Sequence, residues 1–154
     1  MEINFSGKRA LVTGATKGIG KDIATQLSKC GAKVVAVGRT KQLLGELKKE
    51  LPSIEIVELD IADWKQTENV LKNIGPIDLL VNNAGMGWLK SLLDATEEDV
   101  DSVFGVNIKA LINVTKIVVQ NMLDRKVPGS IVNISSQVGP KMSKFMTFIN
   151  NGFC

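Results

Sequence analysis

Short apolar runs alternate with helix-period patterns along most of this chain. The apolar runs are rich in β-branched residues and cover residues 10–13, 34–37, 54–57, 77–81 and 130–134. Three of these five runs are nearly all apolar, which is typical of parallel strands that are covered on both faces. The pattern therefore predicts five strands of a parallel sheet.

Helical periodicity fills the segments between these runs. We expect helices over 19–30, 40–51 and 63–75, the last two capped by Thr40 and by Asp63. The longest helix should begin at a cap on Thr96. Its apolar stripe contains Val100, Val103, Phe104, Asn107, Leu111, Val114 and Val118.

Strands and helices in strict alternation predict an α/β fold, a doubly wound parallel sheet of the Rossmann-like kind. We assign residues 1–139 to this dinucleotide-binding domain. The alternation stops after about Gln137, so residues 140–154 are expected to be a divergent tail. At 154 residues the chain is long enough to bury one core.

Composition and charge argue against several classes of protein. The net charge is only +3 and the basic residues are spread along the chain, which argues against a nucleic-acid partner. Two cysteines give neither a disulfide framework nor a metal-ligand spacing. We see no signal peptide at the start and no uncharged apolar run near the ~20 residues that a membrane span needs. A cytoplasmic protein without a membrane span is expected.

A glycine-rich turn follows the first strand and opens the first helix. Gly14, Lys17, Gly18, Ile19 and Gly20 lie in it. Glycines at such a turn let the backbone approach a pyrophosphate, which sits on free amides at the positive end of the helix. A plain turn would also explain the glycines, but the strand-turn-helix context favours cofactor binding.

Arg39 ends the second strand, where an acidic residue would select NAD by binding the ribose 2′-hydroxyl. An arginine there accommodates a 2′-phosphate instead. Lys17 adds a second positive charge, and no acid occurs in the segment from Val37 to Thr40. Each cation taken alone is more simply a solvated surface charge. Together they indicate NADP(H), with Arg39 and Thr40 in the binding site.

Polar residues also follow the third and fourth strands. Asp60 can accept a hydrogen bond from an adenine amino group, or it can be a structural loop aspartate. Asn83, Ala84 and Gly85 fall at the carboxyl end of the fourth strand, where such sheets bind ligands. A simple turn would explain why asparagine and glycine occur in this segment, but it would not explain why they occur at the end of this strand.

Asn107 and Ser136 are the candidate catalytic residues. Asn107 sits on the apolar stripe of the long helix, so its amide needs a partner in the backbone, in water or in a site. A core amide paired with backbone is the commoner case. Ser135 and Ser136 follow the fifth strand, where an isolated serine is usually a cap.

Taken in order, these motifs resemble the short-chain dehydrogenase/reductase family over residues 5–139. Within it the chain is similar to the dicarbonyl and L-xylulose reductase group of carbonyl reductases. The resemblance rests on residues 5–14, 35–40, 75–84 and 127–137. It implies NADPH-dependent hydride transfer to the ketone of a small ketose or α-dicarbonyl, with Ser136 holding the carbonyl oxygen and Asn107 ordering water and backbone. It also implies homo-oligomers.

The resemblance further implies a tyrosine that donates the proton and a lysine four residues after it. That spacing falls on Ile149 and Phe153, and the chain contains no tyrosine and no histidine. We therefore expect a truncated or alternatively spliced product that lacks the last strands and helices, and much of the oligomer interface, of the family fold.

Three functional interpretations stay open: a weakly active or inactive reductase of a small carbonyl substrate, a non-catalytic NADPH-binding module, and an unstable fragment. Consumption of NADPH would separate the first two. Stabilisation by the cofactor would separate the second from the third.

Overall fold

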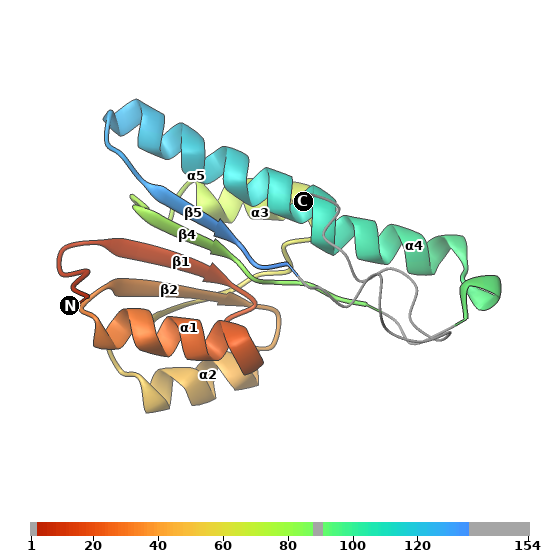
Figure 1. The fold of residues 1–154 in the computed structure, drawn as a ribbon, viewed down its shortest axis with the longest axis horizontal. Helices are drawn as coiled ribbons and strands as arrows, with labels where there is room; N and C mark the ends of the chain where they lie inside the picture. Colours follow the sequence, from red (N-terminus) through yellow and green to blue (C-terminus); the bar gives the residue numbers. More distant parts are fainter. Residues whose placement is uncertain (1–2, 88–90, 136–154) are drawn as a thin grey trace.

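The computed structural model describes residues 3–87 and 91–135, which form one parallel sheet with helices on both faces (Figure 1). The strand order is β3-β2-β1-β4-β5. The strands are β1 (Arg9–Thr13), β2 (Lys33–Gly38), β3 (Glu55–Glu58), β4 (Leu79–Asn82) and β5 (Ser130–Asn133). The predicted fold class is confirmed. The strand order reverses between β1 and β4, and such a reversal is where sheets of this kind open a crevice for a ligand.

Helices connect the strands as the sequence predicts. They are α1 (Gly18–Lys29), α2 (Lys41–Glu50), α3 (Trp64–Leu71), α4 (Glu97–Phe104) and α5 (Leu111–Arg125), with a 3₁₀ turn at Leu92–Asp94 and a π-helical segment at Gly105–Ala110. In Figure 1, α1 and α2 lie on one face of the sheet, and α3 and α5 lie on the other. The third helix ends at Leu71, a full turn earlier than its periodicity suggests.

Two of the three expected caps form. Asp63 accepts a hydrogen bond from the Gln66 backbone, and Thr96 forms a capping box with Asp99. Thr40 occupies the cap position of α2, but its side chain makes no capping hydrogen bond, so that part of the expectation is wrong. Thr40 instead lines the cavity described below.

The sheet separates two apolar cores. On the α1 and α2 face, Ala10, Val12, Val34 and Ala36 pack with helix residues such as Leu47. On the other face, the strand residues Leu11, Val35, Val37 and Leu80 pack with residues of α3 and α5, among them Val114 and Val118 of α5. Strands buried on both faces need continuous apolar sequence, which explains the unbroken runs of β1 and β2.

The front of the long apolar stripe is not buried. Val100 and Phe104 are 40% and 48% exposed, whereas Val103 and Asn107 are buried. Figure 1 shows the reason, since α4 extends beyond the carboxyl ends of the strands. Of the stripe residues in α4, Val103 is therefore buried, while Val100 and Phe104 are not. In the described part of the chain, β3 and β5 are the two outer strands of the sheet, and Val132 on β5 is 50% exposed.

The run from Glu97 to Arg125 is the one described helix that is long and apolar enough to cross a membrane by length and composition alone, with mean hydropathy 1.5 over its most apolar window. Its second half packs against α3 and β4. A core helix of a soluble protein meets the same criteria, so the run is weak support for a membrane span.

Asp78 ties the amino-terminal end of the sheet together. Its carboxylate accepts hydrogen bonds from the Arg9 backbone N–H at 2.9 Å and from Arg125 Nη1 at 3.1 Å. Its backbone oxygen accepts from the Ser130 N–H. Burial raises the pKa of Asp78, but the hydrogen bond from Arg9 and the guanidinium of Arg125 outweigh burial, and the net pKa is lowered.

This lowered pKa predicts an acid-sensitive contribution to stability. Because the carboxyl is more acidic when folded, its contribution is present above the unfolded pKa of about 4 and is lost as pH falls through the folded value. We expect Asp78→Asn to flatten the decline in unfolding free energy below about pH 4. Urea unfolding across this range measures it. Asp124→Asn, on the exposed side of α5, is the control, and an equally flattened profile there would contradict the assignment to Asp78.

Candidate functional site

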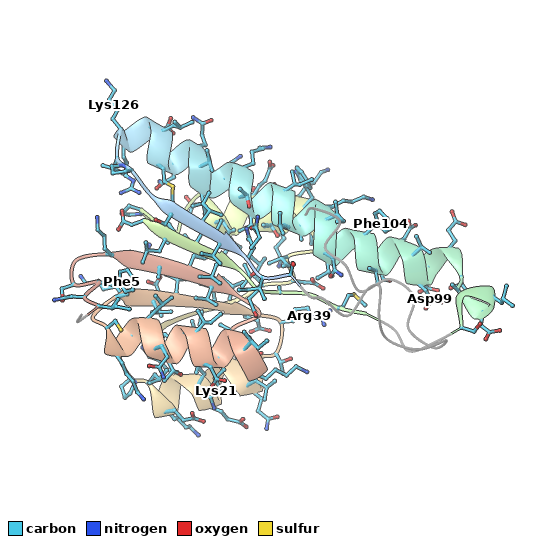
Figure 2. The ribbon with its side chains drawn as sticks, in the orientation of Figure 1. Phe5, Lys21, Arg39, Asp99, Phe104 and Lys126 are labelled. Carbon is cyan, nitrogen blue, oxygen red and sulfur yellow. The ribbon has the colours of Figure 1, made fainter. Side chains whose placement is uncertain are left out.

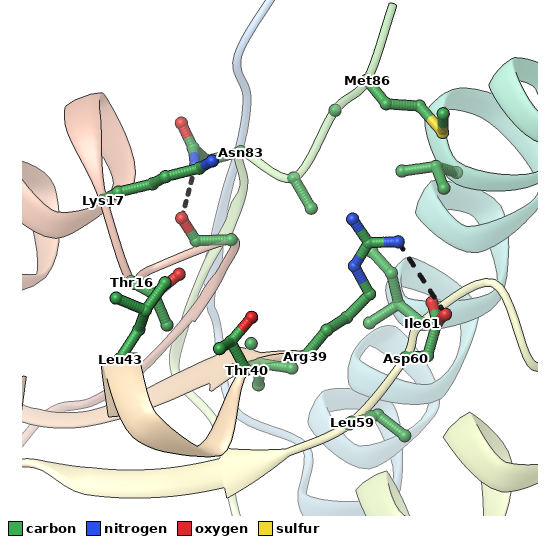
Figure 3. A pocket seen from close by; sticks show the side chains of 16 residues that line it. Thr16, Lys17, Arg39, Thr40, Leu43, Leu59, Asp60, Ile61, Asn83 and Met86 are labelled. Carbon is green, nitrogen blue, oxygen red and sulfur yellow. Dashed lines mark hydrogen bonds and ion pairs between the residues drawn. The ribbon is translucent and has the colours of Figure 1, made fainter. Parts of the chain in front are cut away.

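A cavity of about 260 Å³ opens at the carboxyl ends of the strands (Figure 3). Figure 2 places Arg39 at this end of the sheet and Phe5 and Lys126 at the opposite end. The segments that follow β1, β2, β3 and β4 all contribute to its wall. The lining residues are Gly14, Thr16, Lys17, Val37, Gly38, Arg39, Thr40, Leu43, Leu59, Asp60, Ile61, Asn83, Ala84, Gly85, Met86 and Val106. The cavity lies at the point where the strand order reverses, as the doubly wound fold predicts.

Two glycines of the turn after β1 are there because the chain comes very close to itself. Gly14 has a left-handed φ of +65°, and a Cβ on it would lie 2.9 Å from the Ala84 Cα. Gly20 has no such φ, but a Cβ on it would lie 2.3 Å from both the Gly14 oxygen and Asn83 Nδ2. The turn thus folds onto the segment after β4, which brings two parts of the cavity wall into contact.

Thr13 and Asn83 clamp these two segments together. The Thr13 hydroxyl oxygen accepts hydrogen bonds from the backbone N–H groups of Asn83 and Ala84, both at 3.0 Å. In return, Asn83 Nδ2 donates to the backbone oxygens of Thr13 and Gly14 at 3.1 and 3.2 Å. Sequence reasoning gave Thr13 no role. The signal was a hydroxyl at the last position of an otherwise apolar strand.

Asn107 pairs with backbone rather than pointing an unpaired amide into the cavity. Its Oδ1 accepts from the Met86 N–H and its Nδ2 donates to the Met86 oxygen, both at 2.9 Å. The residue is 4% exposed and lies in the π-helical segment Gly105–Ala110. Single π turns occur often at functional sites. The amide is therefore paired with backbone, one of the partners that the sequence allows, and it fixes the chain at Met86 on the cavity wall.

Three charged side chains face the cavity. Lys17 lies on one side, while Arg39 extends toward Asp60 on the other (Figure 3). Arg39 Nη1 lies 4.0 Å from Asp60 Oδ2, and the two side chains are 64% and 47% exposed. Asp60 Oδ1 accepts a hydrogen bond from the Ala62 N–H at 3.0 Å, which holds the carboxylate in the loop after β3. The cavity mouth is therefore positive, with one acid beside its arginine.

Eight of the predicted cofactor residues line the cavity: Gly14, Lys17, Arg39, Thr40, Asp60, Asn83, Ala84 and Gly85. Gly18, Ile19 and Gly20 do not, since they start α1 behind the turn. Ser136 lies outside the described residues, as does the expected tail from 140 to 154. Sequence reasoning missed the apolar lining, formed by Val37, Leu43, Leu59, Ile61, Met86 and Val106. These residues carry no chemical signature that separates them from core positions.

Comparison with known proteins agrees with this architecture. Residues 8–148 match the model of the short chain dehydrogenase family. The mouse (Mus musculus) protein named L-xylulose reductase is 49% identical over 141 residues, which cover 92% of this chain and 58% of that protein. The pig (Sus scrofa) protein named carbonyl reductase (NADPH) 2 is 51% identical over 138 residues, covering 90% of this chain and 57% of that protein.

Among solved structures, a metagenomic short-chain oxidoreductase in complex with NADP is similar with a TM-score of 0.82 and 32% identity. The match covers 90% of this chain and 66% of that one. The chain thus spans less than two thirds of the length of the relatives it matches. With the family model covering most of the sequence, and with the fold and the cavity placed as described, this chain belongs to the short-chain dehydrogenase family of oxidoreductases.

Proposed function

We propose that this chain is an NADP(H)-binding part of a carbonyl reductase. The observation that carries the proposal is the pair of cations, Lys17 and Arg39, at one cavity whose β2 end contains no acid between Val37 and Thr40. An arginine at this position suits a 2′-phosphate, whereas an acid would suit the free ribose hydroxyl of NAD.

The residues present fit such a cofactor. Gly18 has a left-handed φ of +53°, and a Cβ on it would meet no atom within 4 Å, so open space adjoins the turn. The start of α1 offers free backbone N–H groups and the positive end of a helix dipole, which suit a pyrophosphate. Lys17 and Arg39 would hold the 2′-phosphate, and Asp60 lies near enough to the mouth to contact an adenine amino group.

When bound, a reduced nicotinamide would supply a hydride to a ketone carbonyl. The chain's own residues would exclude water and orient the ligand. Ala84 and Gly85 have little or no side chain, so they leave space for the ligand at the end of β4. Asn107 fixes the position of this segment through its hydrogen bonds with the Met86 backbone. By its resemblance, Ser136 would hydrogen-bond the substrate carbonyl oxygen, where a positioned donor meets the developing negative charge.

The names of the relatives support a small carbonyl substrate. The mouse and pig proteins are called an L-xylulose reductase and a carbonyl reductase. We propose a small ketose or an α-dicarbonyl for this chain, a cytoplasmic location, and the homo-oligomeric association of the family. The chain spans 58% and 57% of the length of those two proteins.

A specific observation favours a second candidate, an NADPH-binding module without turnover. The 154 residues include no tyrosine, the side chain that the family resemblance implies as proton donor to the carbonyl, and no histidine, the commonest general acid. Such a module needs only the glycine turn, Arg39 and the Thr13–Asn83 clamp, all of which lie within the described residues.

A thermal melt with and without each cofactor tests binding. We expect a cooperative transition that NADPH raises more than NADH, since a ligand that binds only the folded state stabilises it according to its affinity. Equal shifts would contradict the assignment of Arg39 to a 2′-phosphate. A cooperative melt that responds to neither cofactor would overturn cofactor binding, and no cooperative melt would favour the unstable fragment.

Replacing Arg39 tests the phosphate site directly. Arg39→Ala should raise the Kd for NADPH about 10- to 100-fold, because a charge-assisted hydrogen bond contributes about 1.5–3 kcal/mol, and should leave the Kd for NADH nearly unchanged. Titration calorimetry with both cofactors measures this. Lys33→Ala removes the same charge from the opposite end of β2 and is the matched control. A similar loss of NADPH affinity in both variants would mean that the net charge of the protein, and not the position of Arg39, determines the affinity for NADPH.

A further inference from the structure

Two buried polar side chains lie behind the cavity and hydrogen-bond to the backbone that leads into it. Thr67 of α3 and Asn113 of α5 are fully buried, and neither is among the residues that line the cavity. The Thr67 hydroxyl donates to the Ile61 backbone oxygen at 3.3 Å, and Asn113 Nδ2 donates to the Trp64 backbone oxygen at 3.0 Å. Ile61 does line the cavity, so Thr67 directly holds part of its wall.

The Thr67 hydroxyl bonds to a carbonyl outside its own helix. A threonine in a helix commonly bonds the carbonyl three or four residues earlier. Here the Thr67 backbone N–H takes the Asp63 oxygen at 2.9 Å, and the hydroxyl reaches Ile61 in the preceding loop. A valine has nearly the same shape and would be buried there without a polar group. The bond to the loop therefore explains why this position carries a hydroxyl.

The loop between β3 and α3 is folded onto the start of α3. The Asp63 N–H donates to the Asp60 backbone oxygen at 3.1 Å, and the Ala62 N–H donates to the Asp60 carboxylate at 3.0 Å. Together with the bond from Thr67 to Ile61, these contacts join the loop to the first turns of α3. The position of α3 therefore sets the position of Ile61 in the cavity wall.

Asn113 fixes α3 against α5, since the two helices pack together and its amide bonds the first residue of α3. Asn113 Oδ1 is buried and has no hydrogen-bond partner among the described residues. Such an oxygen costs stability, and an apolar side chain would avoid that cost. The single bond to Trp64 therefore explains the amide. Asn107, earlier on the same helical run, holds Met86 on the cavity wall, so one run of helix supports two segments of that wall.

We infer that Thr67 and Asn113 are positioning residues that fix the Ile61 side of the cavity for the adenosine half of a dinucleotide. The inference rests on the proposed function, because a 2′-phosphate bound by Arg39 places the adenosine half in this part of the cavity (Figure 3). The loop that carries Ile61 donates a backbone N–H to the Gly38 oxygen, next to Arg39, at 2.9 Å. A wall that is held before the ligand binds lowers the entropy cost of binding.

The Kd values of NADPH, NADH and adenosine 2′,5′-bisphosphate test the inference. The bisphosphate carries adenine and a 2′-phosphate but no nicotinamide. Thr67→Val keeps the shape of the side chain and removes the donor. We expect it to raise all three Kd values by a similar factor, about 3- to 10-fold, which corresponds to one net hydrogen bond. Thr67→Ser keeps a hydroxyl and should bind all three ligands within about twofold of the unsubstituted chain.

Thr25→Val is the matched control. The Thr25 hydroxyl on α1 donates to the Lys21 backbone oxygen at 2.8 Å, so the same substitution removes the same type of bond away from the loop. It should leave all three Kd values unchanged. Thermal melts establish that each titration uses folded protein, because a loss of stability alone does not change Kd while the chain stays folded.

Asn113→Ala tests the contact between α5 and α3, and it keeps the inference testable if Thr67→Val does not fold. It should raise the same three Kd values about 2- to 5-fold. Unchanged Kd values in the Thr67 and Asn113 variants, or weaker NADPH binding with unchanged bisphosphate binding, would overturn the inference alone. Equal weakening by Thr67→Ser and Thr67→Val would also overturn it. Failure of the unsubstituted chain to bind any of the three ligands would overturn the proposed function and this inference with it.

Discussion

With a small ketose or an α-dicarbonyl, the purified chain is expected to consume NADPH about 10²- to 10⁴-fold more slowly than a full-length relative such as the mouse L-xylulose reductase. The physical reason is the missing general acid. A carbonyl oxygen gains negative charge as the hydride arrives, and a positioned proton donor typically supplies this factor in rate. Ile149 and Phe153, which stand where the resemblance implies tyrosine and lysine, neither donate a proton nor carry a charge.

Loss of NADPH absorbance, measured with both proteins at equal concentration, checks this expectation. Arg39→Ala is the control for the origin of any residual rate, because turnover at the proposed site should fall further when the phosphate contact is lost. A rate comparable to that of the mouse protein would contradict the expectation and would show that another side chain supplies the proton.

Among Gly→Ala substitutions in the described part of the cofactor turn, Gly20→Ala is expected to destabilise the protein most. Its Cβ would lie 2.3 Å from the Gly14 oxygen and from Asn83 Nδ2. Neither atom can move away cheaply, because the first is backbone and the second donates hydrogen bonds to Thr13 and Gly14. Overpacking of this kind costs about 1–3 kcal/mol or more, and here it also pushes apart the two segments that form the cavity wall.

We therefore expect a lower unfolding free energy and loss of the NADPH-dependent rise in Tm. Gly45→Ala is a matched control, since Gly45 lies within α2 and a Cβ there would meet no atom within 4 Å. That substitution should stabilise the chain by about 0.5–1 kcal/mol through helix propensity. If Gly20→Ala behaved like Gly45→Ala, the close approach of the turn to Asn83 would be wrong.

The sequence predicted the fold well because the fold depends on local signals. The apolar run at 34–37 became β2, the capping signal at Thr96 became a capping box, and Gly31 marks the end of α1. The parallel sheet followed from strands that need cover on both faces. The signals for where helices end were weaker, and α3 stops at Leu71 although its pattern continues.

The candidate site was predicted only as far as each residue carries its own chemistry. Glycines in a turn and an arginine at the end of a strand are informative by type, and Gly14, Arg39 and Asn83 do line one cavity. Thr13 was missed because a threonine in a strand has no distinctive chemistry until its partners are known. The apolar lining, such as Leu43 and Val106, was missed for the same reason.

Sequence alone thus determined the order of strands and helices, the sign of charge beside the glycine turn, and the absence of tyrosine and histidine, because each is a property of neighbouring residues or of composition. Tertiary structure alone decided that Asn107 pairs with Met86 backbone, that Thr13 clamps Asn83, and that Arg39 rests beside Asp60. These contacts join residues about 20 to 70 positions apart, and only tertiary packing at the carboxyl ends of the strands brings such residues together.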